Sequence, residues 1–297
     1  GESFEGTIDG NGHAISNLSV NRSDTSTAGL VGEIGSSGSI QNLTIENASI
    51  TGNDDLGVIA GTSAGTIRNV TVTGTVSGND RIGGVVGNVD TGGSVTGSTA
   101  AVDTSGNKAI GGLVGESSGA VNNASASGDV TAIGQYAGGL IGDHQSTTPV
   151  HDVSASGTVT GTDSTGGLLG RAQANVTDAT ASGEVNGTTA GTNVGGLIGE
   201  YDPSQQATIA NVSASGNVSG STGTGGLIGI SRPSSRVTVS DARATGDVTA
   251  AVGGTTHAYV GGLVGELQNA GDVRICSAAG VVRVSGNSNN VPGTKVG

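Results

Sequence analysis

Apolar and polar residues alternate strictly in short segments of the chain. Within residues 150–161, Val153 and Ala155 alternate with Ser154 and Ser156, and a glycine separates them from a second alternating segment. A period of two residues is typical of half-buried β-strands. The same pattern recurs from one end of the chain to the other. We therefore predict about three short strands in each repeat, separated by corners of Gly, Asn or Asp.

A second pattern, in which two glycines precede two apolar residues and a further glycine, recurs in nine near copies. Its most regular form is Gly111-Gly-Leu-Val-Gly115. The copies begin at Ala28, Gly57, Gly83, Gly111, Gly138, Gly166, Gly195, Gly225 and Gly261. Measured at the glycine just before the apolar pair, successive copies are 27 to 30 residues apart, except for a last step of 36. A fixed period of this size indicates a stacked repeat architecture, in which one repeat buries its apolar face only against the next.

The two patterns together predict an all-β fold: a single-chain parallel β-solenoid (β-helix) of about ten turns of about 28 residues. At ~4.8 Å per stacked turn, its length would be on the order of 45–50 Å. We expect one domain, with residues 1–27 as an atypical first turn and residues 28–297 as the repeats. The residues that end the chain match those that lead into the copy at Gly261, so we expect the repeats to continue beyond residue 297.

The first turn carries two signals of its own. Asp9-Gly10-Asn11-Gly12 is a strong tight-turn sequence, because Asn and Gly tolerate positive φ angles. Phe4 is the one phenylalanine of the chain, and we expect it to cover the end of the first turn.

One corner of each repeat can be followed as a column of mostly Asn and Asp. The column consists of Asn17, Asn42, Asn69, Gly97, Asn123, Asp152, Asp178, Asn211, Asp241 and Ile275. Stacked Asn side chains can hydrogen-bond to their counterparts in the turns above and below. We therefore expect its eight Asn and Asp residues to form a structural ladder. The next column inward contains Cys276, which we interpret as a small core residue and not as a reactive thiol.

Composition limits the possible partners. Glycine accounts for 58 of 297 residues and aromatic residues for 1%, so the core must be thin and aliphatic. The net charge of −13 argues against nucleic acid or an anionic membrane as a partner, since both are bound through clustered Lys and Arg. An apolar run near the ~20 residues that a membrane-spanning helix needs is absent, so we expect no membrane insertion of this segment. With Lys at only two positions, Lys108 and Lys295, the acidic excess fits a protein hydrated in strong salt, and it also fits an ordinary acidic secreted protein.

The nine glycine-rich units and the opening at residues 4–20 resemble the GLUG-motif repeat proteins, which are large bacterial and archaeal surface and secreted proteins. The resemblance covers essentially the whole chain, although each single motif is short. It implies a β-solenoid in an extracellular, cell-surface and often adhesin-like polypeptide, such as a stalk or filament. It transfers no catalytic residue. We expect such a segment to be non-catalytic and to associate with itself, end to end or laterally, or with other surface components.

The competing interpretation is a β-helix that binds carbohydrate or cleaves polysaccharide, as an enzyme or a viral tailspike. Its best acid pair is Asp152 and Asp178, one turn apart in the corner column. Insertions at residues 201–207, 231–236 and 250–257 are expected to protrude as loops and would be its recognition site. Four histidines lie in different repeats without triad or metal-ligand spacing, and aromatic residues for sugar stacking are scarce.

Two further kinds of site follow from residue type alone. Calcium is the one cofactor that the acids suggest, and the weak candidates for it are Asp9, Asp54, Asp55, Asp152 and Asp178. Ten Asn-x-Ser/Thr sequences are potential N-glycosylation sites. Five of them are ladder members (Asn17, Asn42, Asn69, Asn123 and Asn211), which we expect to be unmodified. The better candidates are Asn21, Asn47, Asn175, Asn186 and Asn217.

Overall fold

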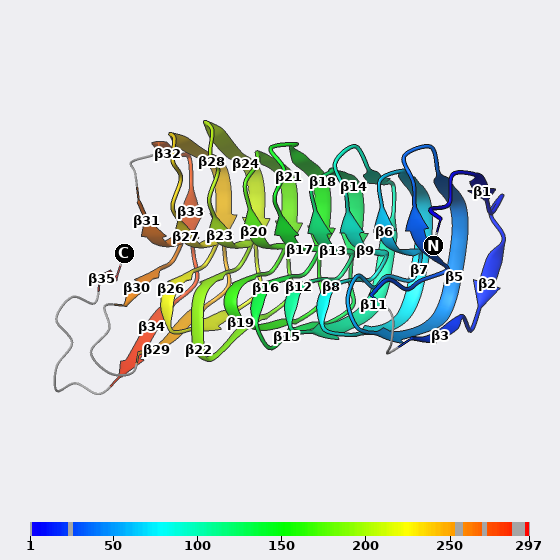
Figure 1. Cartoon of the computed structure of the whole chain (residues 1–297). Coiled ribbons are helices and arrows are strands. Elements are labelled where there is room, and N and C mark those ends of the chain that lie inside the picture. The colour runs from blue at the N-terminus through cyan, green and yellow to red at the C-terminus, as the bar shows by residue number, and fades with distance from the viewer. Residues whose placement is uncertain (1, 23–25, 253–257, 269–271, 287–294, 297) are drawn as a thin grey trace.

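The computed structural model describes residues 2–22, 26–252, 258–268, 272–286 and 295–296. Every regular element in these ranges is a β-strand, and the strands pair in parallel with the equivalent strands of the turns before and after. The turns stack into an elongated body whose two termini lie at opposite ends (Figure 1). The predicted all-β parallel solenoid is therefore confirmed. No helix in the described ranges is long and apolar enough to cross a membrane.

The strand after each Gly-Gly pair joins one nine-stranded parallel sheet, so each sequence copy corresponds to one strand. Its members are β4 (Val31–Ile34), β6 (Ala60–Ser63), β9 (Val86–Val89), β13 (Val114–Ser117), β17 (Ile141–His144), β20 (Leu169–Ala172), β23 (Ile198–Tyr201), β27 (Ile228–Ser231) and β31 (Val264–Leu267). Nine strands bracket eight complete turns. The expectation of about ten turns included the incomplete ones at both ends.

The remaining strands form a 26-stranded sheet that wraps around the other sides of the stack. The side with the Asn and Asp corner is made of β1 (Thr7–Asp9), β2 (Ala14–Ser16), β3 (Ser19–Arg22), β5 (Ser39–Gly52), β7 (Thr66–Ser77), β10 (Ser94–Thr96), β11 (Thr99–Gly106), β14 (Ala120–Ala126), β18 (Val150–Ala155), β21 (Val176–Ala181), β24 (Ala207–Ala214), β28 (Val237–Ala244), β32 (Asp272–Arg274) and β33 (Ser277–Ala278). The chain then continues through β15 (Val130–Ala132), β19 (Val159–Gly166), β22 (Val185–Gly195), β25 (Val218–Gly220), β29 (Val248–Val252) and β34 (Val282–Gly286). It returns to the next Gly-Gly pair through β8 (Asp80–Gly83), β12 (Lys108–Gly111), β16 (Gln135–Gly138), β26 (Thr222–Gly225), β30 (Tyr259–Gly261) and β35 (Lys295–Val296).

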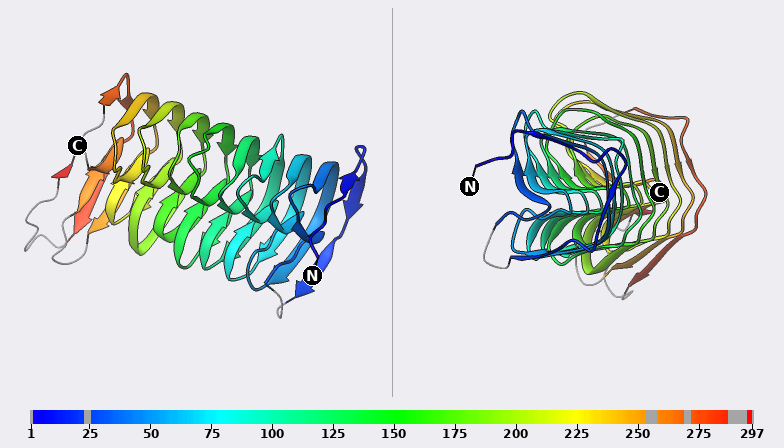
Figure 2. Two further views of the ribbon diagram at one scale, coloured as in Figure 1. Left: turned by 45° about the horizontal axis from the view of Figure 1, so that its top comes forward. Right: turned by 90° about the vertical axis from the view of Figure 1, so that its right-hand side faces the viewer.

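The turn that contains β13 to β16 has four strands, one more than the predicted three. The additional break falls at the Ser-Gly-Asp segment around Gly128, where a Cβ would lie 2.1 Å from the Val102 carbonyl oxygen of the preceding turn. Earlier turns run through this point as one long strand, as in β5 and β7. Viewed along the stack, successive turns follow nearly the same outline (Figure 2).

A thin aliphatic core extends through the turns, as the composition predicted. Each Gly-Gly pair from Gly83 to Gly226 is followed by a fully buried apolar side chain such as Leu113, Leu140 or Leu168. An alanine column faces the second glycine of the pair. A Cβ on Gly112, for example, would lie 3.0 Å from the Ala126 Cβ. Only a residue without a side chain lets the two sides of the turn approach this closely.

The third glycine of each unit lies where two backbones touch. At Gly115, a Cβ would lie 2.6 Å from the Gly87 oxygen, the Arg81 carbonyl carbon and the Ile82 nitrogen. Equivalent positions in other turns bring a Cβ within 2.4–2.6 Å of backbone atoms. We call this column the glycine seam; it consists of Gly61, Gly87, Gly115, Gly142, Gly170, Gly199, Gly229 and Gly265. The recurring sequence unit is therefore a packing device that joins the nine-stranded sheet to the strands before it.

The first turn follows the prediction in two respects and departs from it in one. Asn11 and Gly12 have φ angles of 49° and 77°, and His13 donates its backbone N–H to the Gly10 carbonyl, which is a type I′ turn. Phe4 is half-buried against the core and bridges to Ile34. Asn17, however, is not in the column of Asn42, because Ser16 pairs with Glu46 and thereby sets Asn17 beside Asn47.

The position that aligns with Asn42 is Gly10, since Asp9 pairs with Gln41. Asn17 was assigned to the column because its sequence context matches that of Asn42. The long strand β5 instead pairs with three short strands of the first turn, and this pairing changes the alignment.

Candidate functional site

From Asn42 onward the predicted corner column is continuous. All nine of its members, from Asn42 to Ile275, have φ angles between 49° and 61°. This is the left-handed region, which Asn, Asp and Gly enter at least cost, and the requirement explains why these residues recur there. Ile275 is the exception in residue type, and its side chain is 83% exposed. The column therefore exists primarily because each turn must bend at this point.

Hydrogen bonds between turns link only part of this column. Asn42 donates its Nδ2 to Asp9 Oδ1 at 3.0 Å, and Asn69 donates to Asn42 Oδ1 at 3.2 Å. Further along, Asn211 donates to Asp178 Oδ1 at 2.5 Å. Within the described residues, the side chain of Asn123 has no hydrogen bond, because the turn before it has Gly97 at this position. The ladder thus consists of two bonded segments with an interruption between them.

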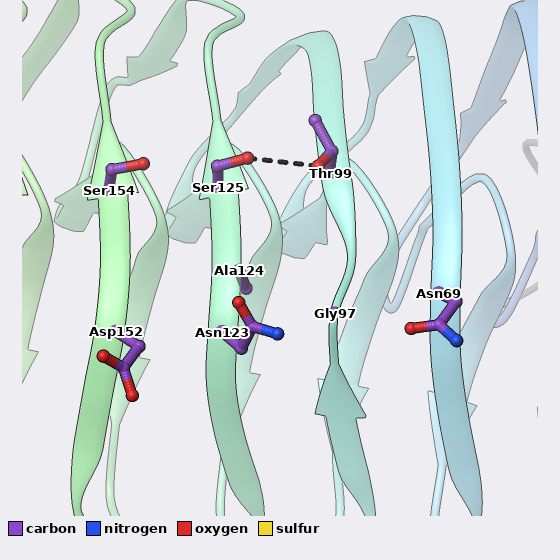
Figure 3. Close-up of a pocket in the computed structure, with 8 residues that line it drawn as sticks. All are labelled: Asn69, Gly97, Thr99, Asn123, Ala124, Ser125, Asp152 and Ser154. Carbon is purple, nitrogen blue, oxygen red and sulfur yellow. Dashed lines mark hydrogen bonds between the residues drawn. The ribbon is translucent and has the colours of Figure 1, made fainter.

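A shallow polar hollow of about 310 Å³ lies at this interruption. It spans four turns and is lined by Asn69, Gly97, Thr99, Asn123, Ala124, Ser125, Asp152 and Ser154. Figure 3 shows the amide oxygen of Asn69 and the amide nitrogen of Asn123 turned towards Gly97 from opposite sides. The hydroxyls of Thr99 and Ser125 hydrogen-bond to each other at 3.1 Å along one margin. Nothing in the sequence separated Gly97 from the other column members, because glycine is an ordinary corner residue.

The acid pair Asp152 and Asp178 lies on adjacent turns, as predicted. Both side chains are exposed, and each carboxylate has a partner of its own. Asp152 accepts a hydrogen bond from His151 Nδ1 at 2.8 Å, and Asp178 accepts from Asn211. The two acids therefore lie on an open surface, where water is not excluded from them.

The other calcium candidates are occupied by protein donors. Asp54 accepts hydrogen bonds from the Asn79 side chain and the Asp80 backbone, and Asp55 accepts two from Arg81, at 2.5 and 2.8 Å. Asp9 accepts from the Asn11 backbone and from the side chains of Asn42 and Gln41, and these bonds hold the pKa of Asp9 below its usual value. In the part of the chain that the structure describes, no three His, Cys, Asp or Glu side chains converge as metal ligands.

The N-glycosylation candidates differ in exposure. Asn21, Asn47 and Asn217 are exposed, whereas Asn175 and Asn186 are half-buried. Asn47 donates its amide nitrogen to Asn17 at 2.7 Å, so it belongs to a short ladder of its own. Of the five sequons expected to be unmodified, Asn17, Asn69, Asn123 and Asn211 are exposed.

Two other expectations concern the loops and the cysteine. Tyr201, which opens the first insertion, is fully buried and donates its hydroxyl to the Ala174 carbonyl at 2.9 Å, so the expectation that it protrudes is wrong. Burial raises its pKa. Residues 253–257, including His257, lie outside the described ranges. Cys276 packs against the core as predicted, and its Sγ lies 3.2 Å from the Arg274 carbonyl oxygen.

A second column of left-handed residues lies beside the glycine seam, and sequence analysis did not find it. It contains Asp55, Arg81, Ala109, Tyr136, Ser164, Asn193 and Gly223, with φ angles of 47–65°. Arg, Ala and Tyr rarely adopt this conformation, so residue type gave no signal of a corner. An alignment of the repeats could have found this second column, because each of its members stands two residues before the start of a copy of the glycine-rich unit.

Side chains of this second column meet charged residues of the nine-stranded sheet. Arg171 donates Nε and Nη2 to the two oxygens of the fully buried Asp143, at 2.8 and 2.7 Å. Its guanidinium lies 4.5 Å from the ring centroid of Tyr136 and donates to the Tyr136 hydroxyl at 3.2 Å. Burial alone would lower the Arg171 pKa, but the hydrogen bond and charge of Asp143 raise it overall. We call Tyr136, Asp143 and Arg171 the buried ion-pair cluster.

Further polar and charged side chains interact beside the glycine seam. Ser164 donates its hydroxyl to Glu200 at 2.7 Å. Burial, and then the neighbouring charge of Asp143, raise the pKa of Glu116, while Arg81 and Lys108 partly oppose them. The bonds from Arg171 to Asp143 and from Ser164 to Glu200 therefore each join one turn to the next.

This geometry defines a class of protein: a β-solenoid whose repeats are joined by a glycine seam. A family model described as the GLUG motif matches residues 106–131, which contain the unit Gly111–Gly115, so the resemblance to GLUG-motif proteins is confirmed.

Among curated proteins, the chain is similar to halomucin of Haloquadratum walsbyi (strain DSM 16790 / HBSQ001). The two are 64% identical over 275 residues, a match that takes in 73% of this chain and 3% of halomucin. The chain thus spans only a small part of that much larger relative. No solved structure matches the chain.

Proposed function

We propose that this chain is a rigid, non-catalytic structural segment of a large extracellular surface protein. The observation that carries the proposal is the unbroken stack: the nine-stranded sheet pairs each turn with the next from β4 to β31. The interior of that stack is filled by aliphatic side chains. Such a body keeps two distant points of a polypeptide at a fixed separation, which is the property that a stalk, a filament or an adhesive surface layer requires.

The likeness to halomucin supports an extracellular location, because halomucin is a large cell-surface protein. The charge distribution supports it too. On a further corner of the stack, Asp103, Asp129 and Glu184 are exposed and Asp247 is half-buried. With the net charge of −13, they keep the surface hydrated and oppose non-specific association.

Catalysis is a weaker alternative. An acid pair that hydrolyses glycosides needs two carboxyl groups at a set separation, one of them with a raised pKa. Asp152 and Asp178 are exposed and hydrogen-bonded to separate donors. The carboxylate whose pKa burial does raise, Glu116, lies on another face of the turn, in β13.

Two finer properties belong to the same proposal. N-linked glycans on exposed asparagines such as Asn21 and Asn217 would add to surface hydration. Association between copies is also proposed, because the exposed side chains of Leu267, Val273 and Ile275 offer apolar surface to a second copy.

Antibody accessibility on cells of the source organism tests the location. An antibody raised against the isolated chain should label intact, unpermeabilised cells as strongly as permeabilised ones. Label that appears only after permeabilisation would contradict the proposal. An antibody against a cytoplasmic protein serves as the control for cell integrity.

A further inference from the structure

The hollow at Gly97 leaves a hydrogen-bond donor and an acceptor facing each other without partners. Asn69 uses its amide nitrogen on Asn42, and its Oδ1 lies only 2.4 Å from where a Gly97 Cβ would be. On the other side, Asn123 turns its Nδ2 towards the same space (Figure 3). Among the described residues, neither the Asn69 oxygen nor the Asn123 nitrogen has a hydrogen-bond partner. One rung of the ladder is therefore missing, and the groups that would bond to it are in place.

The missing rung defines the chemistry of its replacement. A group in this space must donate a hydrogen bond to Asn69 Oδ1 and accept one from Asn123 Nδ2. Both hydrogen bonds must run parallel to the axis of the stack. A trans secondary amide has this arrangement, because its N–H and C=O bonds point in opposite directions in one plane. Amide groups also stack at the ~4.8 Å spacing of neighbouring strands in cross-β ladders. An acetamido group thus reproduces the rung that Gly97 lacks.

The rest of the lining favours a sugar as the carrier of that amide. The hydroxyls of Thr99, Ser125 and Ser154 and the carboxylate of Asp152 surround the space, whereas the apolar Ala124 is buried. Hydroxyl and carboxylate groups complement the hydroxyls of a sugar ring, and there is no apolar pocket here for a peptide side chain. At about 310 Å³ and open to solvent, the hollow admits one ring while its substituents extend outward.

We propose that the hollow over Gly97 is a binding site for a 2-acetamido sugar, with the acetamido group bridging Asn69 and Asn123. The proposal deepens the surface role proposed above by naming the class of glycan that the rod recognises. Because a single neutral rung and a few hydroxyl contacts carry the interaction, one site binds weakly. A glycan with several acetamido sugars would gain by engaging several copies of the chain.

The test is nuclear magnetic resonance titration of the whole chain with methyl N-acetylglucosaminide. We expect the side-chain amide signals of Asn69 and Asn123 to shift, and saturation transfer to the acetamido methyl group. Methyl glucoside, which lacks the acetamido group, should bind roughly tenfold more weakly, since it forgoes the bridging hydrogen bonds. Absence of shifts at Asn69 and Asn123 at the highest soluble sugar concentration would overturn the proposal.

The variant Gly97→Asn fills the space with the side chain that other turns carry. Asn suits the φ of 61° at this position, and the new Cβ displaces only the end of the Asn69 side chain, so the variant should fold and complete the ladder. It should lose sugar binding, whereas Asn211→Ala, in the same column but distant from the hollow, should keep it.

Equal binding by wild type and Gly97→Asn would contradict the site. Equal binding of a blocked dipeptide amide would show that any secondary amide is accepted, and would overturn the assignment to sugar. Neither result bears on the extracellular location, which antibody labelling tests separately.

Discussion

The glycine seam and the Asn and Asp corner both place one equivalent residue in every turn, but for different physical reasons. In the seam, a Cβ on Gly115 would lie 2.6 Å from backbone atoms on two sides, so the position excludes every side chain. At the corner, only the left-handed backbone is required, and Asn, Asp, Gly and even Ile275 occupy it. The seam thus limits the volume of the side chain, and the corner limits the backbone conformation of the residue.

The difference explains where function can be located. Substitutions at the corner change the surface while the turn keeps its path, so the corner can acquire a recess such as that at Gly97. The seam cannot vary in this way without separating the two backbones. A solenoid of this type can therefore keep the same packing in every turn while its surface residues differ from turn to turn.

The largest expected effect comes from adding one methyl group to the seam. Gly115→Ala should lower the free energy of unfolding by about 3 kcal/mol, because the backbone of a neighbouring turn must move. Gly92→Ala is the control, since a Cβ there has nothing within 4 Å. With its φ of 90°, the control should cost about 1 kcal/mol. Denaturant unfolding of both variants measures the difference; equal losses would show that the seam is not tightly packed.

Removing one partner from the buried ion-pair cluster ranks next. Asp143→Ala leaves Arg171, whose side chain is 20% exposed, without its carboxylate, so we expect a loss of about 2 kcal/mol. The exposed pair of Arg283 and Asp247 provides the comparison, and Arg283→Ala should cost less than ~1 kcal/mol. Repeating the unfolding experiment in molar salt sharpens the contrast, since salt screens exposed pairs far more than buried ones. A loss for Asp143→Ala that disappears in salt would contradict its burial.

The next largest effect is a pH dependence of stability that arises from a buried histidine. His144 is fully buried, and burial lowers its pKa below 6.5. The unfolded chain therefore binds a proton more readily than the folded one, and stability should fall as pH drops below about 6.5 towards the folded-state pKa. The slope for one such proton is at most about 1.4 kcal/mol per pH unit. The variant His144→Gln should reduce this slope between neutral and mildly acidic pH; an unchanged slope would exclude His144 as its source.

The smallest expected change is a gain at the corner. Gly97→Asn should raise the free energy of unfolding by about 0.5 kcal/mol, because it restricts the unfolded chain and completes the ladder between Asn69 and Asn123. Thermal unfolding of this variant beside wild type would detect the gain. A loss greater than that of Gly92→Ala would mean that the corner, too, is limited by volume.

The repeat period and the strand alternation were sufficient to predict the solenoid, because both patterns reflect burial against the next turn. The recurrence of Asn and Asp predicted the corner column from Asn42 onward, because the left-handed bend of each turn favours these residues. These sequence patterns misplaced Asn17, since the pairing of three short first-turn strands with β5 depends on contacts between turns and not on local sequence. They also missed the second left-handed column, because Arg81 and Tyr136 adopt that conformation through tertiary contacts that residue type does not reveal.

X-ray scattering from the isolated chain tests the central claim most directly, since it measures both the stacking distance and the shape of the particle. In an oriented sample, the structure predicts a reflection at ~4.8 Å along the long axis of the particle. In solution, it predicts an elongated particle of on the order of 40 Å, from eight complete turns at that spacing. A compact globular profile, or strand spacing perpendicular to the long axis, would contradict the stacked solenoid and with it the structural role proposed for this protein.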